Sequence, residues 1–420
     1  MTDAILAPEA SLSSVRSHTA KALKRMTAAA FAALAFTLAG CATSGGGNTT
    51  ATNEVRPPVA PPTSIHTQIP DTPTGTDTKV QVAILLPFSH SQKDTRTLAA
   101  SLLNAAQLAL FDANNPNIEL IPIDTKGTPG DAAAAANSAL AQGAEIILGP
   151  VFAEQVTAVA PLARLRNVPV IAFSTDTSVA GNGVYLLSFA PEEEVRRIVS
   201  YAASQGLTNI AALFPASPYG NRVSLAFNAA TVANGVSVAA TAIYPQRPEE
   251  MNPAVESIAG TNFQAVLLPE GGQLLRALGP ILPFNNIDPR TVRFLGTGLW
   301  DEAATAKEPA LVGGWFAAPE PTSRQTFADR YRTVYDSRAP RVASLGYDAM
   351  ALATVLAREP AGSRYTLTSI TDPNGFLGVD GIFRFKADGT LERGLAVVEV
   401  TNGGFTVVSP APRTFEPSAF

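Results

Sequence analysis

The stretch Val80-Gln81-Val82-Ala83-Ile84-Leu85-Leu86 decides the fold, because it is an almost uninterrupted apolar run of a single strand's length. Such a run is typical of a strand buried on both faces, as in a parallel sheet. The region Thr97–Asn114, rich in alanine and leucine, predicts a helix. A second strand is expected over Asn117–Ile123, so the folded region begins as strand, helix, strand.

Strands and helices alternate along the rest of the chain, and the alternation restarts after about Pro191. Further strands are expected at 144–148, 168–173, 209–214, 236–244, 264–268 and 292–295, with helices between them and at 324–335 and 342–358. This alternation predicts right-handed crossovers and parallel sheets, so we expect an α/β protein with two doubly wound lobes. Near the C-terminus, Gly381–Phe385 and Ala396–Val400 are expected to pair around a turn at Asp388-Gly389.

The N-terminus carries the pattern of a bacterial lipoprotein signal. Basic residues at 21, 24 and 25 precede the apolar run Thr27–Gly40, which ends in Leu38-Ala39-Gly40-Cys41. A positive flank, a short apolar segment and small residues before a cleavage site are typical of a secretory signal. The run is too short for a bilayer, which needs about 20 residues. We expect a signal peptide over 1–40 and lipid on Cys41; the alternative makes Cys41 an ordinary small residue.

Composition excludes several classes of protein. Cleavage would remove four basic and two acidic residues, which takes the formal net charge from -5 to -7. An acidic protein is a poor electrostatic partner for nucleic acid, so we expect no nucleic-acid binding. Because Cys41 is the only cysteine, no intramolecular disulfide can form. The hydrophobic fraction of 46% is enough for a sizeable core, and the mature length suggests two domains.

Residues 41–79 are expected to be the lipidated N-terminus followed by a disordered linker. The segment contains Gly45-Gly46-Gly47, Pro57-Pro58 and Pro61-Pro62, many threonines and few large apolar side chains. Such a composition buries too little surface to offset the entropy of ordering. A random coil of about 36 residues spans roughly 30–35 Å, so we expect the folded body to hang on a long tether.

Polar residues follow the expected strands at their carboxyl ends, which is where doubly wound sheets bind ligands. Their hydroxyl groups and the free amides of helix N-termini could hold a small polar ligand. The alternative is that these side chains only cap helices. The candidates for the ligand cleft are Ser89, Gly149, Val151, Ser174, Thr175, Thr177, Tyr219, Glu270 and Asp301.

The order and spacing of these motifs resembles the type I periplasmic-binding-protein fold, in particular the branched-chain-amino-acid-binding family. The matching stretches are 82–110, Gly149-Pro150, 168–171, Tyr219-Gly220, 269–273 and 376–385. The resemblance implies two lobes, joined by three crossover strands, that close on a ligand, with Tyr219 lining the cleft. It suggests residues 80–190 and about 317–370 for lobe 1, 191–316 and about 371–408 for lobe 2, and a tail at 409–420.

Two departures from that family concern the ligand. Amino-acid-binding members place a serine after the glycine turn to hold the ligand carboxylate, but here the sequence is Val151-Phe152-Ala153-Glu154. The acid that holds the ligand ammonium would fall near Gly298, and Asp301 lies three residues further on. Because a zwitterion in a dry cleft needs both charges paired, the standard recognition of an amino acid is not visible.

A second resemblance is to the penicillin-binding-protein activators, lipoproteins with a type I body that stimulate peptidoglycan synthases from the outer membrane. The lipid signal, the linker and the weakened ligand motifs agree with that group, and Ala42 after the cysteine favours the outer membrane. The extra N-terminal helical-repeat domain of well-known activators is absent. This resemblance implies an outer-membrane lipoprotein facing the periplasm, with a bifunctional penicillin-binding protein as partner.

The alternative is a substrate-binding lipoprotein of an ABC transporter for amino acids, amides or related small polar molecules. An enzyme is not expected. Among the three histidines only His90 lies in the folded body, and no Gly-x-Ser-x-Gly elbow accompanies it. Too few His and Cys residues remain for a zinc site, and Glu192-Glu193-Glu194 is typical of a first helical turn. We therefore expect no catalytic residue, no metal and no cofactor.

Overall fold

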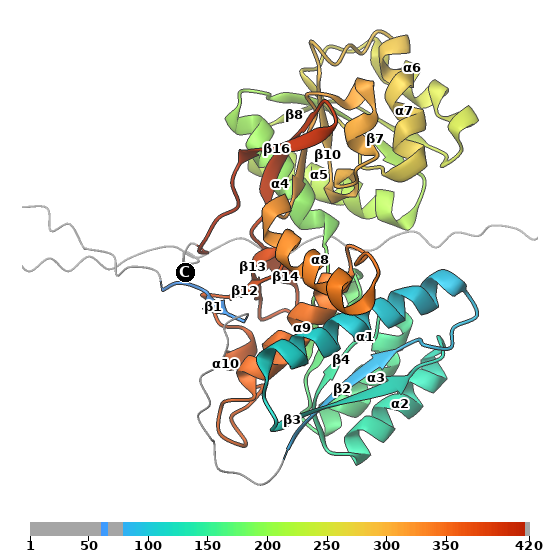
Figure 1. Cartoon of the computed structure of the whole chain (residues 1–420). Helices are drawn as coiled ribbons and strands as arrows, with labels where there is room; N and C mark the ends of the chain where they lie inside the picture. Colours follow the sequence, from blue (N-terminus) through green and yellow to red (C-terminus); the bar gives the residue numbers. More distant parts are fainter. Residues whose placement is uncertain (1–59, 66–78, 416–420) are drawn as a thin grey trace, which may run out of the picture. The chain divides into compact units, whose positions relative to one another are not determined.

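The computed structural model describes residues 60–65 and 79–415 (Figure 1). Cys41 and the expected signal peptide lie outside the described residues. Three sheets form the framework, of five, seven and four strands. Within the described part of the chain, no helix is both long and apolar enough to cross a membrane.

The five-stranded sheet is entirely parallel, with strand order β3-β2-β4-β5-β6. Its strands are β2 (Val80–Leu86), β3 (Ile118–Asp124), β4 (Ala144–Leu148), β5 (Val170–Ala172) and β6 (Val184–Leu186). Helices around this sheet are α1 (Lys93–Ala113), α2 (Pro129–Ala141), α3 (Ala153–Leu165), α8 (Pro321–Tyr335), α9 (Ala343–Leu356) and α10 (Leu367–Ile370).

Strand β2 is buried on both faces, as its apolar sequence predicts. Ile84 and Leu86 belong to a core that includes α1 and α9, whereas Ala83 and Leu85 belong to a core that includes α2 and α3. A strand covered by helices on both sides has no solvent-facing row, which explains the continuous apolar run. The glycine after β4 is required by the same close packing, because a side chain on Gly149 would collide with the Leu85 carbonyl oxygen.

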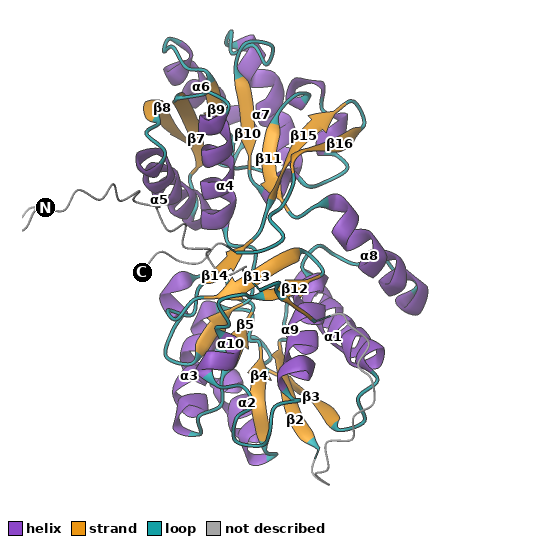
Figure 2. Ribbon diagram, turned by 90° about the vertical axis from the view of Figure 1, so that its left-hand side faces the viewer, coloured by secondary structure: helices purple, strands orange, loops and turns teal. Residues whose placement is uncertain are grey.

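The seven-stranded sheet has the order β16-β15-β11-β10-β9-β7-β8 (Figure 2). Its strands are β7 (Asn209–Pro215), β8 (Ser237–Tyr244), β9 (Ala265–Leu267), β10 (Arg293–Gly296), β11 (Trp315–Ala318), β15 (Ala396–Thr401) and β16 (Gly404–Ser409). Its helices are α4 (Pro191–Ser204), α5 (Pro218–Ala233), α6 (Asn252–Ala259) and α7 (Gly272–Phe284). Short 3₁₀ turns are η1 (Thr177–Val179), η2 (Pro248–Glu250), η3 (Gly298–Trp300), η4 (Thr305–Lys307) and η5 (Pro309–Leu311).

The predicted pairing near the C-terminus is wrong for Ala396–Val400. Strand β15 pairs with β11 and with β16, and not with β13. The turn at Asp388-Gly389 instead joins β13 to a short strand, β14. Because β14 spans only Leu391–Arg393, its sequence carries too little alternation to be recognised as a strand.

The four-stranded sheet has the order β1-β12-β13-β14 and joins segments that are far apart in sequence. Its strands are β1 (Thr63–Ser64), β12 (Phe376–Gly378), β13 (Gly381–Phe385) and β14. Phe376, Phe383 and Phe385 pack in the same core as Ile84. These residues fall within the range 371–408 predicted for the second lobe, whereas their aromatic side chains join the core of the first sheet.

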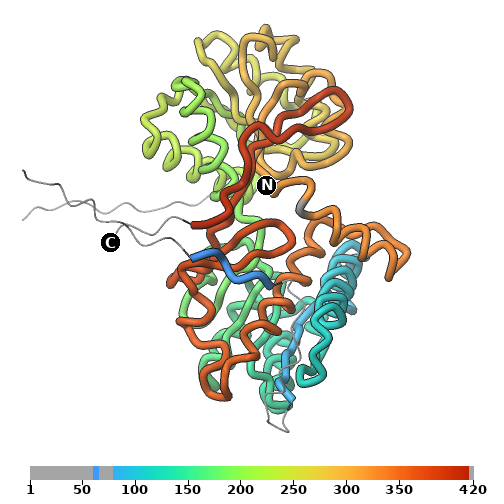
Figure 3. Tube along the Cα trace, turned by 60° about the vertical axis from the view of Figure 1, so that its left-hand side comes forward, coloured from blue at the N-terminus to red at the C-terminus, as the bar shows by residue number. Residues whose placement is uncertain are grey.

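Part of the predicted linker is ordered. Thr63 and Ser64 pair in parallel with Phe376 and Leu377, and the Ile65 side chain is buried in the core of the first sheet. Figure 3 shows this short blue segment beside the orange and red C-terminal strands. The expectation of disorder is therefore wrong for residues 63–65, because burying the large Ile65 side chain offsets part of the ordering entropy.

The chain passes between the two large sheets three times, at 187–190, 319–320 and 394–395. Three crossings are what the resemblance implies. The carboxyl ends of the parallel strands carry most of the candidate ligand residues, so these ends define two rims. The first rim comprises Ser89, Gly149, Val151, Ser174, Thr175 and Thr177; the second comprises Tyr219, Glu270, Thr297, Gly298 and Asp301.

Candidate functional site

On the first rim, the residues after β2 and β4 already have partners within the protein. The Ser89 hydroxyl donates to Asp124 at 2.5 Å, and the Gly149 N–H donates to the Ile171 carbonyl at 2.7 Å. Partial burial acts to raise the pKa of Asp124, but hydrogen bonds from Ser89 and the backbone lower it overall. Val151 packs against the core. These residues hold the rim together, and of them only Ser89 presents an exposed polar group.

Thr175 and Thr177, after β5, differ from the neighbouring Ser174. Ser174 is buried, and its hydroxyl oxygen accepts a hydrogen bond from the Asp176 N–H at 3.1 Å. This contact stabilises the local turn. Both threonines are exposed and line a cavity of about 240 Å³. The cavity is also lined by Ser188, Glu192, Glu193, Lys386, Asp388 and Thr390, among others. The structure thus brings two predicted residues into one polar cavity.

On the second rim, two tyrosines are held in pairs with polar side chains. The Tyr219 and Thr297 hydroxyls lie 2.9 Å apart, and Tyr244 donates to Glu270 at 3.1 Å. Burial, followed by the charge of Glu194, raises the pKa of Tyr219; burial and Glu270 raise that of Tyr244. Both phenols therefore keep their proton at physiological pH, and Tyr244 donates a hydrogen bond to Glu270.

Glu270 is a buried side chain whose carboxyl oxygens have three donors around them. Besides Tyr244, the Gln246 amide donates to it at 3.4 Å, and its other carboxylate oxygen accepts the Gly271 N–H at 3.1 Å. The carboxylate sits between the end of β9 and the start of α7. A carboxylate that is held in this way at a strand end is preorganised to accept a further donor from a ligand.

Arg341 connects the second rim to the helix α9 that packs on the first sheet. Its guanidinium donates to the Gly298 carbonyl and lies 3.3 Å from Glu194, which in turn accepts the Gly298 N–H at 3.0 Å. Burial raises the pKa of Glu194, while Arg341 and the Gly298 N–H oppose that rise. Phe189 lies under the guanidinium, 4.3 Å from its carbon. Glu194 was expected only to complement a helix dipole, and its role in this bridge has no signal in the sequence.

The bridge surrounds Gly298, the position near which the resemblance implies an acid for a ligand ammonium group. A side chain at position 298 would meet Glu194 at 2.4 Å and Arg341 at 2.5 Å, so only glycine fits without rearrangement. Asp301, the nearest predicted acid, pairs with Arg324 at 2.5 Å. Neither position therefore offers an acid to a ligand ammonium in this conformation.

Two further acids, which the sequence analysis did not single out, lie behind the rims. Asp348 and Asp380 are fully buried, and Ser344 donates to Asp380 at 2.5 Å. Burial, followed by the charge of Asp380, raises the pKa of Asp348 to about 8. The buried Arg393 carries the compensating positive charge. These side chains come from α9, from the turn between β12 and β13 and from β14, so no local motif marks them.

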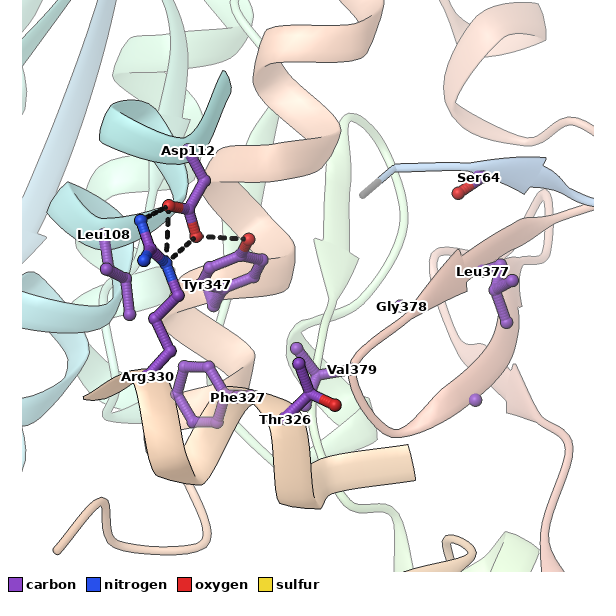
Figure 4. Close-up of a pocket in the computed structure, with 11 residues that line it drawn as sticks. Ser64, Leu108, Asp112, Thr326, Phe327, Arg330, Tyr347, Leu377, Gly378 and Val379 are labelled. Carbon is purple, nitrogen blue, oxygen red and sulfur yellow. Dashed lines mark hydrogen bonds and ion pairs between the residues drawn. The ribbon is translucent and has the colours of Figure 1, made fainter. Parts of the chain in front are cut away.

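A separate cavity of about 450 Å³ lies outside both rims, where α1, α8, α9 and β12 meet (Figure 4). Asp112 accepts from Arg330 Nε at 2.8 Å and from the Tyr347 hydroxyl at 3.1 Å on one wall. Leu377 and Val379 line another part of it. Arg330 and Asp112 pair with each other on this wall. The cavity shares no residue with either rim.

No group of three or more His, Cys, Asp or Glu residues is arranged to hold a metal ion within residues 60–65 and 79–415. His90 accepts the Gln92 N–H at 3.1 Å and lies beside the Phe152 ring. His90 therefore lies in the loop after β2, against the Phe152 side chain.

Comparison with known proteins agrees with this geometry. A model of the family described as periplasmic binding protein matches residues 79–404, which is most of the chain. The chain belongs to the periplasmic binding protein family. Among curated proteins, this periplasmic binding protein is 22% identical over 181 residues to uncharacterized protein RP748 of Rickettsia prowazekii. That match covers 43% of this chain and about half, 47%, of the relative.

Solved structures of binding proteins share the fold at low sequence identity. A putative branched-chain amino acid ABC transporter protein from Rhodospirillum rubrum is 17% identical with a TM-score of 0.69, over 79% of this chain and 100% of that one. A solute-binding protein of Rhodopseudomonas palustris, in complex with 3,4-dihydroxybenzoic acid, is 17% identical with a TM-score of 0.59, over 80% and 97%. An isoleucine complex from Streptococcus pneumoniae is 18% identical with a TM-score of 0.57, over 79% and 100%. These structures establish the type I fold of this periplasmic binding protein.

Proposed function

We propose that this protein is a non-catalytic binding protein of the cell envelope that receives a small polar molecule between the two rims and delivers it to an ABC transporter. The preorganised second rim carries the proposal. Tyr219 with Thr297, and Glu270 with Tyr244, place hydroxyl groups and a buried carboxyl group at the carboxyl ends of β7, β8, β9 and β10. Ligands of doubly wound sheets bind at such ends, and family membership supports the same role.

The class of ligand follows from the groups that the rims present. An α-amino acid needs an acid for its ammonium group, and position 298, where the resemblance implies one, is a glycine. Arg341 lies at that end of the second rim, and its buried Nε atom has no hydrogen-bond partner among the described residues. Amides and hydroxylated carboxylic acids therefore suit the rims better than amino acids do. The 3,4-dihydroxybenzoate complex of the Rhodopseudomonas relative is one example of that chemistry.

The proposal is tested by the thermal shift of the full-length chain with acetamide, isoleucine and 3,4-dihydroxybenzoate. We expect stabilisation by at least one amide or hydroxylated acid. Tyr219→Phe should raise the dissociation constant of that ligand about tenfold, which is the effect of losing one hydrogen bond to a ligand. Tyr335→Phe is the control, because Tyr335 donates to the Asn104 carbonyl outside both rims. A panel without any stabilising compound, or equal effects of the two substitutions, would count against the proposal.

A second candidate function is activation of a peptidoglycan synthase, as the activator resemblance implies. The observation that favours it is the bridge that Arg341, Gly298 and Glu194 form with one another. A cleft that is held by internal contacts suits a protein whose functional partner is another protein. Capture of a bifunctional penicillin-binding protein by the full-length chain, with no thermal shift from any compound, would favour this function over transport.

We also propose that a lipid on Cys41 anchors the protein in the outer membrane, with Ala42 supporting that membrane. Because β1 begins at Thr63, about 22 residues instead of about 36 separate the lipid from the body. As a random coil they span roughly 25 Å. Cys41→Ala should move the protein from the membrane fraction to the soluble periplasmic fraction. If Cys41→Ala remains membrane-bound after a salt wash, the lipid is not the anchor.

A further inference from the structure

The cavity where α1, α8, α9 and β12 meet is large enough for a small molecule, and the proposed function makes no use of it. Its volume of about 450 Å³ falls in the range of about 300–1,000 Å³ that small-molecule pockets occupy. Asp112 and Arg330 are the charged residues of its lining, and Leu108, Phe327 and others make much of the rest apolar. This α8 cavity therefore has the size and the composition that are typical of a ligand site.

One wall of the α8 cavity is formed by two strands that are distant in sequence. Ser64 of β1 and Leu377 of β12 are partners in register, and both line the cavity. Their neighbours Ile65 and Phe376 are buried in the core of the first sheet, and successive side chains of a strand point to opposite faces. Ser64 and Leu377 therefore face the cavity. Because Leu377 is 40% exposed, a ligand there would cover apolar surface that the protein's own residues leave open.

The other side of the cavity carries an acid whose oxygens already have donors. Arg330 donates to Asp112 Oδ1 and Oδ2 through Nε, at 2.8 and 3.2 Å, and again to Oδ1 through Nη2. The Tyr347 hydroxyl donates to Oδ2 at 3.1 Å. Figure 4 shows these contacts on one side of the cavity and Ser64 and Leu377 on the other. A cationic ligand would have to compete with a guanidinium that is already in place.

The guanidinium of Arg330 has an edge that the ion pair does not use. Arginine carries five N–H donors in a planar fork, and its contacts with Asp112 involve Nε and Nη2. Within residues 60–65 and 79–415, Nη1 of Arg330 donates no hydrogen bond, and the side chain is 45% exposed. Two parallel N–H groups on one edge of a guanidinium fit a carboxylate in bidentate geometry. The cavity thus offers a charged donor to an anionic acceptor.

We propose that the α8 cavity binds a monocarboxylate with an apolar body. The carboxylate takes the unused edge of Arg330, and the body packs against Leu108, Leu377 and Val379. The apolar lining selects against strongly polar molecules, since burying their polar groups without partners costs free energy. The cavity shares no residue with either rim, so this site is separate from the one in the proposed function.

Isothermal titration calorimetry with octanoate tests the proposal. The protein is the full-length chain carrying Cys41→Ala, so that no attached lipid competes for the cavity. We expect octanoate to bind. Hexanoate should bind about tenfold more weakly, because it buries two methylene groups fewer. 1-Octanol should also bind about tenfold more weakly, because it has no carboxylate to pair with the guanidinium.

Two substitutions at the ion pair should change the affinity in opposite directions. Arg330→Gln should raise the dissociation constant of octanoate about tenfold, because it removes the charged donor. Asp112→Asn should lower it about threefold, because asparagine still accepts from Arg330 but no longer repels the ligand. A merely structural role of the pair would instead make both substitutions weaken binding.

A third substitution tests the apolar wall, and a fourth is the matched control. Leu377→Ser should raise the dissociation constant about tenfold by removing apolar contact. Arg332→Gln should leave it unchanged, because Arg332 lies on the same helix but pairs with the exposed Asp329 and does not line the cavity. Unfolding midpoints from circular dichroism should stay close to that of the parent chain, since Arg330 and Leu377 are exposed.

Four results would overturn the proposal. The first is the absence of octanoate binding. The second is equal weakening by Arg330→Gln and Asp112→Asn, and the third is a loss in Arg332→Gln as large as that in Arg330→Gln. The fourth is a comparable loss in Tyr219→Phe, which would place octanoate between the rims. Failure of the proposed function would leave octanoate binding and its dependence on Arg330 unchanged, so the two outcomes are distinguishable.

Discussion

Replacing Arg341 with methionine is expected to lower the free energy of unfolding by about 3 kcal/mol. Arg341 is the closest cation to Glu194, whose side chain is only 7% exposed. Methionine keeps much of the apolar contact with Phe189 but removes the charge and the donor to the Gly298 carbonyl. A buried carboxylate that loses its partner must either stay charged at high cost or take up a proton.

A double variant distinguishes loss of the ion pair from loss of packing. Glu194→Gln in the Arg341→Met background removes the stranded charge, so it should recover at least half of the lost stability. Arg332→Met is the control, because its pair with Asp329 is exposed and should cost less than about 1 kcal/mol. Urea unfolding monitored by circular dichroism measures all four chains. An Arg341→Met chain as stable as Arg332→Met would show that the bridge does not hold the rim.

The second large effect is a loss of stability as the pH rises. Asp348 has a folded-state pKa of about 8, against an ordinary value of 3.8. The folded protein therefore holds a proton that the unfolded chain has lost between these two values, and stability falls as pH rises through this window. Burial raises the pKa of Glu194 as well, which acts in the same direction. Acids with lowered pKa values, such as Asp124, affect stability only at lower pH.

Unfolding by urea at about pH 5 and about pH 8 tests this prediction. The native chain should be less stable at the higher pH, and Asp348→Asn should reduce the difference, because asparagine does not titrate. Asp329→Asn, at an exposed position of α8, should leave the difference unchanged. Stability that rises with pH in the native chain, or an equal slope in Asp348→Asn, contradicts the assignment of a proton to Asp348.

Much of the fold is predictable from the sequence because parallel strands covered on both faces have a direct signature. The run Val80–Leu86 and the alternation after it indicate doubly wound sheets, and the structure and the family match confirm this. The short strands β6, β12 and β14 are not predictable in this way, because three residues are too few to show a repeating pattern of apolar side chains. Strand β1 is not predictable either, because it depends on pairing with the distant strand β12 and on burial of Ile65 in the core of the first sheet.

The candidate site is predictable in part. Strand ends identify Tyr219 and Glu270, and the structure adds their partners Thr297 and Tyr244. Arg341, however, reaches the second rim from the loop before α9, so its role depends on tertiary structure alone. The activator resemblance remains a prediction, while the solved structures that share the fold include ABC transporter binding proteins.

Hydrogen–deuterium exchange of the full-length chain tests the central claim, binding between the two rims, most directly. The experiment compares the free chain with the chain saturated by whichever compound gives the largest thermal shift. We predict slower exchange in peptides from both rims, around 174–177, 215–219, 269–272 and 296–301, and no change in the peptides of α5 and β8. Protection confined to the cavity beneath α8, or to one rim alone, would contradict binding between the rims.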